Sequence, residues 1–217
     1  MSRSEAIAGA TAYFDSGAFA ADLARRVAFR TESASAEARP ALRAYLEQEM
    51  APAVGRLGAE ARIAENPDPD AGPLLIADRH ESGDLPTVLT YGHADVVLAE
   101  PERWRPGLDP WRVTAEADRW YGRGTADNKG QHTINLAALE QVLLARSGRL
   151  GFNLKVLIET GEEIGSPGLA EFCARHRAEL AADLLIASDG PRVAADRPTV
   201  FLGQGERQAV VPTVAVA

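Results

Sequence analysis

The 217-residue sequence has little of what several classes of protein need. It contains one cysteine, Cys173, which excludes an internal disulfide framework and predicts a reducing, cytoplasmic location. No run approaches the ~20 apolar residues of a membrane span, and the first residues lack the apolar stretch of a signal peptide. Clusters of lysine and arginine are also missing, and the formal net charge is -8. The sequence therefore argues against secretion, membrane insertion and nucleic-acid binding.

What remains is an ordinary globular composition, with 46% hydrophobic and 25% charged residues, enough for one domain with a real core. Helical spacing of apolar residues predicts helices over residues 18–30, 41–57, 129–146 and 167–180. Short aliphatic or β-branched runs predict strands over residues 60–64, 74–78, 87–91, 153–158 and 183–187, and a hairpin from 111–115 and 119–121. The alternation of these elements predicts an α/β fold with a mixed, mostly parallel sheet flanked by helices.

Polar segments follow three of the predicted strands and open one predicted helix. They span residues 92–95, 122–130, 159–166 and 188–190. In open sheets flanked by helices, ligands bind beyond the carboxyl ends of the strands. Folding is therefore expected to bring these four segments to one edge of the sheet.

The first segment places His93 after an apolar strand, with Asp95 two residues later. Positions two apart on an extended segment face the same way, so Asp95 is placed to hold the imidazole of His93. A metal-bound histidine usually donates its other N–H to such a carboxylate. Taken alone, the pair equally fits the capped end of a strand.

In the second segment, Gly122 and Gly124 form a flexible turn before Asp127, whose two oxygens suit a bridge between two cations. Two other interpretations stay open for this loop, an anion-binding loop before a helix and a structural turn. The dinucleotide motif Gly-x-Gly-x-x-Gly is absent, and Lys129-Gly130 is not a phosphate-binding motif. A nucleotide-binding function is therefore unsupported.

The last two segments add three carboxylates. Glu162 and Glu163 are adjacent, and like charges so close need either full solvation or a cation. Their side chains diverge, so one can bind metal while the other acts as a general base. Asp189 follows an apolar run and, taken alone, also fits a turn or a helix cap. The other histidines lack strand-end settings and are predicted to be surface or packing residues, namely His80, His132 and His176.

Taken in order, these four segments resemble the motifs of the M20 family of zinc metallopeptidases and related amidohydrolases. The resemblance spans most of the chain, to about residue 202. It implies a hydrolase in which His93 and Asp189 bind one Zn²⁺, Glu163 binds the other and Asp127 bridges both. Mn²⁺ and Co²⁺ are alternative metals for such ligands. An aspartate at position 189 resembles the dipeptidase and aminopeptidase branches more than the deacylase branches.

The resemblance also implies roles for the remaining carboxylates. Glu162 resembles the general base of the family, and Asp95 resembles the partner of His93. A cis peptide bond is implied after Asp127. In such a site two cations activate a shared water and polarise the amide carbonyl.

The end of the chain departs from the family pattern. Residues 1–202 correspond to the N-terminal part of a catalytic domain, and residues 203–217 form a short atypical tail where a lid or dimerisation domain is expected after a strand at 199–203. The last histidine ligand of the family is missing, which predicts a weak second metal site, weak or absent hydrolysis by this chain alone and an exposed strand edge. For the full-length form the resemblance implies a homodimer.

Three functions remain open. The first is hydrolysis of a small, dipeptide-like substrate, and the second is hydrolysis of an N-acyl amino acid at the same site. The third is a noncatalytic metal-binding or interaction fragment. A panel of substrates separates the first two, and metal binding without turnover is typical of the third.

Overall fold

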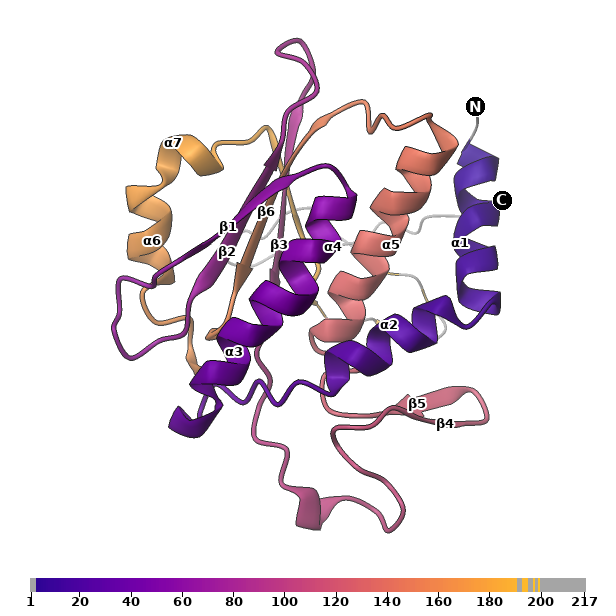
Figure 1. Ribbon diagram of the computed structural model, residues 1–217, viewed down its shortest axis with the longest axis vertical. Coiled ribbons are helices and arrows are strands. Elements are labelled where there is room, and N and C mark those ends of the chain that lie inside the picture. Colours follow the sequence, from indigo (N-terminus) through magenta and orange to yellow (C-terminus); the bar gives the residue numbers. More distant parts are fainter. Residues whose placement is uncertain (1–2, 191–192, 195–196, 198, 200–217) are drawn as a thin grey trace.

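A computed structural model describes residues 3–190, 193–194, 197 and 199, and its centre is a five-stranded sheet with helices on both faces (Figure 1). The order of the strands is β1-β2-β6-β3-β7. Their bounds are Glu60–Ala64 (β1), Leu74–Arg79 (β2), Thr87–His93 (β3), Asn153–Glu159 (β6) and Leu184–Ala187 (β7). The predicted α/β class is confirmed, and the five predicted strands of this sheet are present with ends that differ by at most two residues. In the predicted hairpin, the strand expected over residues 111–115 begins three residues later, at Thr114.

The sheet is mixed, and its parallel part carries the polar segments. Strand β3 pairs in parallel with β6 on one side and with β7 on the other. The β1–β2 and β2–β6 pairs are antiparallel. The register places His93 opposite Glu159 and Tyr91 opposite Ala187. The carboxyl ends of β3, β6 and β7 therefore lie at one edge, as the sequence predicts.

One face of the sheet is covered by the N-terminal helices and the helix that follows the glycine-rich loop (Figure 1). These elements are α1 (Arg3–Asp15), α2 (Ala18–Val27), α3 (Arg39–Tyr45), a π-helical turn (Leu46–Met50), α4 (Ala51–Arg56) and α5 (Lys129–Ala145). Buried side chains such as Met50 and Leu136 meet Leu75, Val156 and Ile158 of the strands. This layer forms the larger core.

The opposite face carries two short helices, α6 (Leu169–Arg175) and α7 (Arg177–Leu180) (Figure 1). Phe172 and Leu180 pack there against Leu74, Ile76 and Leu157. Strand β7 has all four residues exposed. The predicted exposed edge of the sheet is therefore present in the described part of the chain.

The connection from β3 to α5 leaves the sheet at the edge that carries the polar segments. It contains a 3₁₀ turn (Pro101–Arg103) and the hairpin of β4 (Thr114–Glu116) and β5 (Arg119–Tyr121). The loop then folds tightly onto the start of α5, where the Gly130 N–H donates to the Gly124 carbonyl at 3.0 Å. A Cβ at Gly130 would lie 1.9 Å from the Thr125 carbonyl oxygen, so only glycine fits this position. This contact fixes the loop that carries Asp127.

Several predicted helix bounds are wrong. The helix predicted over residues 18–30 ends at Val27 because the chain turns toward the segment that follows β3, where the Thr31 carbonyl accepts a hydrogen bond from the Val96 N–H at 2.9 Å. The helix predicted over residues 41–57 begins earlier, as α3, and contains the π-helical turn.

The helix predicted over residues 167–180 is also wrong in its bounds. It begins at Leu169, after Gly168 at a φ of 76°, and is interrupted at His176. Helix α1 was not predicted, because its sequence has no apolar stripe and none of its residues is buried. The strand predicted over residues 199–203 and the tail 203–217 lie outside the described residues, apart from Thr199. Among the described helices, none has the length and apolar character needed to cross a membrane.

Candidate metal centre

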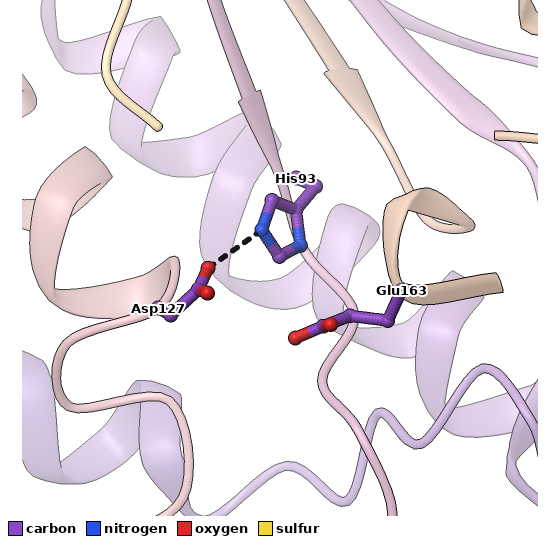
Figure 2. A group of neighbouring side chains, drawn as sticks. All are labelled: His93, Asp127 and Glu163. Atoms are coloured by element: carbon purple, nitrogen blue, oxygen red, sulfur yellow. Dashed lines mark hydrogen bonds and ion pairs between the residues drawn. The ribbon is translucent and has the colours of Figure 1, made fainter. Parts of the chain in front are cut away.

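Four elements deliver the predicted ligands to the carboxyl edge of the sheet. His93 is the last residue of β3, and Asp127 lies in the loop before α5. Glu163 belongs to a 3₁₀ turn that follows β6, and Asp189 lies two residues beyond β7. Figure 2 shows the carboxylates of Asp127 and Glu163 directed toward the imidazole of His93. Segments far apart in the sequence therefore meet at one point.

The ligand atoms form two overlapping groups around His93. One group is His93, Asp127 and Glu163, and the other is His93, Glu162 and Asp189; in each, one ligand atom per residue lies within 4.8 Å of the others. The Nε2 atom of His93 is 2.8 Å from Asp127 Oδ1, and 3.9 Å from both Glu162 Oε2 and Asp189 Oδ1. All the predicted ligands and the predicted base are thus brought together.

Asp95 contacts both His93 and the turn that carries Glu162 and Glu163. Its side chain is 0% exposed, and its Oδ1 atom lies 3.2 Å from His93 Nδ1. The same carboxylate accepts the backbone N–H groups of Glu162, at 3.2 Å, and Glu163, at 3.1 Å. Asp95 therefore orients the imidazole, as expected from the sequence, and also fixes the turn that carries both glutamates.

Asn128 is a structural residue of the centre that the sequence analysis missed. Its side-chain oxygen accepts the His93 N–H at 3.3 Å, and its Nδ2 donates to the Ser188 carbonyl at 2.6 Å. A Cβ at position 92 would lie 2.9 Å from the Asn128 oxygen, which explains Gly92. The Asp127–Asn128 peptide bond is cis, as the resemblance implies. Asn128 thus connects the segments that carry His93, Asp127 and Asp189.

The charges at the centre influence one another strongly. Burial alone would lower the pKa of His93, but the hydrogen bond to Asp95 and the charges of Asp95, Asp127 and Asp189 raise this pKa to about 9. Burial raises the pKa of Glu162 and of Glu163, and the neighbouring carboxylates raise both further, while His93 opposes the rise. The site therefore favours added positive charge.

The donor set fits zinc. One imidazole nitrogen faces the carboxylates while the other is held by Asp95, which is the usual arrangement of a zinc-bound histidine. The remaining donors are carboxylate oxygens, which are hard ligands that bind Zn²⁺ and, in other sites, Mn²⁺. A cation among them would also relieve the repulsion that raises the pKa values of Glu162 and Glu163.

Glu159 is a second residue to which the sequence analysis gave no role. It is 2% exposed and accepts hydrogen bonds from the Tyr91 hydroxyl and from Ser166 Oγ, the latter at 2.9 Å. Ser166 also donates its backbone N–H to the Gly161 carbonyl at 2.8 Å, which closes the turn around the two glutamates. Glu159 therefore connects strand β3 to the turn that carries Glu162 and Glu163.

Replacing Glu159 with glutamine is expected to weaken zinc binding roughly tenfold, because residues that support metal ligands typically contribute 10–100-fold in affinity. The amide keeps the volume of the side chain but accepts fewer hydrogen bonds. Competition with a chelating dye measures the affinity, and Tyr91→Phe is expected to weaken it in the same direction. Unchanged zinc affinity in both variants would show that Glu159 does not support the metal ligands.

The residues expected to lie outside the centre do so. His132 is buried on α5, with its Nε2 atom 2.6 Å from the Tyr45 hydroxyl oxygen. His176 lies between α6 and α7 rather than within one helix, and its Nδ1 is 2.8 Å from Glu179. Cys173 is half-buried on α6. In the described residues, neither potential metal group includes any of them.

The model of peptidase family M20/M25/M40 matches residues 89–209 of this chain. The matched region contains both ligand groups and Asp95. The chain belongs to this family. The M20 resemblance that the sequence motifs carry is thereby confirmed.

Similar proteins within this family include dipeptidases. A cysteinylglycine-S-conjugate dipeptidase of Corynebacterium striatum is 36% identical over 140 residues, which cover 64% of this chain and 30% of that protein. A Beta-Ala-His dipeptidase of Mus musculus is 31% identical over 186 residues, covering 79% of this chain and 37% of its own length. The crystal structure of human carnosine dipeptidase 1 superposes with a TM-score of 0.75 at 26% identity, over 91% of this chain and 43% of that one.

These matches confirm the predicted fold as that of an M20 catalytic domain. The chain spans about a third of the length of these two curated relatives.

Proposed function

We propose that this chain carries the zinc centre of an enzyme that hydrolyses the amide bond of a short, dipeptide-like substrate. The observation that carries the proposal is the pair of ligand groups that share His93 at the carboxyl edge of the sheet. Its relatives named as dipeptidases support the same class of substrate.

The shared histidine determines how two ions would be divided between the ligands. His93 Nδ1 is held by Asp95, so one nitrogen, Nε2, is left for a metal, and it serves a single ion. We assign His93 and Asp189 to one Zn²⁺, Glu163 to the other, and Asp127 to both. The 60% exposure of the Asp127 side chain leaves its oxygens accessible for this bridge.

Two zinc ions held by these residues would polarise the amide carbonyl and lower the pKa of an attacking water. Residues of the chain position the reacting groups and transfer the proton. Glu162 takes the proton of the water on its carboxylate and returns it to the leaving amide nitrogen. Asp95 keeps Glu162 and His93 in position through the contacts described above.

The proposal is tested by assaying a panel of dipeptides with the purified chain after addition of two equivalents of zinc. Turnover is expected to disappear when EDTA removes the metal and to return when zinc is restored. A folded, zinc-loaded chain that cleaves no member of the panel would contradict the proposal.

The same panel separates the competing functions. A deacylase and a dipeptidase would use the same centre and differ in substrate. Adding N-acyl amino acids to the panel therefore distinguishes them. Stoichiometric zinc binding with no turnover of any substrate would favour a noncatalytic metal-binding fragment.

A further inference from the structure

A second feature of the edge is a cleft of 420 Å³ that the proposed centre does not use. It lies between the loop that follows β3 and the segment that precedes α5. Its lining consists of Ala99, Glu100, Arg103, Trp104 and Arg123. Two of these five side chains, Arg103 and Arg123, are cationic, and one, Glu100, is anionic.

Arg123 is held in a fixed position in this cleft. Its Nη2 donates to the Leu98 carbonyl at 3.2 Å, and its guanidinium lies 5.7 Å from the centre of the Trp104 ring. The indole in turn donates to the Ala99 carbonyl at 2.7 Å. The Arg123 backbone N–H donates to the Pro110 carbonyl at 2.7 Å. A guanidinium fixed in this way loses little conformational entropy when a ligand binds.

The charge of Arg123 is not neutralised within the described part of the chain. The nearby carboxylate of Glu100 is bound by Arg103 at 2.7 Å. Among the described residues, no carboxylate lies within 4.0 Å of the Arg123 guanidinium, and its Nε is buried with no hydrogen-bond partner. An anion placed beside the guanidinium would neutralise this charge.

Both walls of the cleft are continuous with the candidate metal centre. Leu98 follows Asp95 by three residues, and Arg123 precedes Asp127 by four. The two segments are in contact near the centre, where a Cβ at Gly124 would lie 3.1 Å from Val96 Cγ1. The chain segments that form the cleft therefore continue directly from the segments that carry Asp95 and Asp127.

We propose that this cleft binds a carboxylate of the peptide substrate, with Arg123 as the residue that determines this specificity. The planar guanidinium matches a carboxylate, and the face of Trp104 offers an apolar surface beside it. The carboxylate is either an acidic side chain or the C-terminus of the peptide. The proposal rests on the proposed function, because it concerns the substrate of the same centre.

The test measures calorimetric affinities of three probes for the zinc-loaded Glu162→Gln chain, which does not consume them. The probes are alanyl-glutamate, alanyl-glutamine and alanyl-glutamine amide. Arg123→Gln, in the same background, is expected to weaken roughly tenfold the binding of the probes that carry the recognised carboxylate, because a hydrogen-bonded charge contributes about that much at an open site.

The pattern of losses identifies the carboxylate. Loss confined to alanyl-glutamate indicates an acidic side chain, whereas loss for every probe except the amide indicates the C-terminus. Arg123→Lys keeps the positive charge but lacks the planar, two-pronged guanidinium, and its affinity is expected to lie between those of the parent and Arg123→Gln chains. It replaces Arg123→Gln in the test if that variant does not fold. Arg119→Gln, on the exposed residue of β5, is the matched control and should change nothing.

Equal affinities of the parent and Arg123→Gln chains for all probes would overturn the proposal, as would an equal loss in Arg119→Gln or no measurable binding of any probe. Hydrolysis of alanyl-glutamine by the zinc-loaded native chain is measured in parallel. If the native chain hydrolyses the peptide but the Arg123→Gln substitution does not change probe binding, the proposed role of the cleft is wrong and the proposed hydrolysis stands. An effect of Arg123 on binding, without turnover of any peptide, overturns the proposed hydrolysis alone.

Discussion

Replacing Glu162 with glutamine is expected to lower dipeptide turnover about a hundred- to ten-thousandfold while zinc remains bound. Glutamine has the same shape, and the turn keeps its backbone hydrogen bonds to Asp95. It has no carboxylate to take a proton from water, so the chemical step loses its base. Turnover and zinc content are measured on the same samples, the first by release of the free amino acid and the second by elemental analysis.

Two controls make this result specific to Glu162. Glu179→Gln alters a surface glutamate that is paired with Arg62 and should leave turnover unchanged. Glu163→Gln should lower zinc content as well as turnover, because it removes a proposed ligand. Full activity of the Glu162→Gln chain would reject Glu162 as the base, and loss of its zinc would reassign Glu162 as a ligand.

Replacing His93 with alanine is expected to weaken zinc binding by at least about a hundredfold and to abolish turnover. His93 is the one residue common to both ligand groups, and it supplies their single nitrogen donor. Supporting residues alone contribute roughly 10–100-fold to metal affinity, so loss of a direct ligand should exceed this range. Zinc affinity is measured by competition with a chelating dye.

The matched control is His176→Ala, which removes a half-exposed histidine that is paired with Glu179 away from the centre. Circular dichroism monitors the fold of both variants. An unchanged zinc affinity in folded His93→Ala protein would place the metal elsewhere in the molecule.

The centre of the fold is predictable because short aliphatic and β-branched runs have a strong local preference for the extended conformation. Strand β1 has the predicted bounds, and β3, β6 and β7 differ from the predicted bounds by one or two residues. Parallel pairing then brings the ends of these strands together, so His93, Glu163 and Asp189 could be grouped before any coordinates were known.

The parts that were missed depend on contacts between distant residues. Asn128 is one polar residue among many in the sequence, and its role arises only when the loop before α5 folds against β3 and Ser188. Glu159 is likewise defined by the Tyr91 hydroxyl on the neighbouring strand. Helix α2 ends early because Thr31 joins the segment after β3, which no local pattern indicates. Such tertiary contacts override local propensity.

The central claim is that zinc binds at the edge of the sheet where β3, β6 and β7 end. The most direct measurement is an anomalous difference map at the zinc absorption edge, from crystals of the zinc-loaded chain. The account predicts two peaks, one in contact with His93 and Asp189 and one in contact with Glu163, with Asp127 between them. Peaks confined to other residues, such as His176 and Glu179, with none at His93, would contradict it.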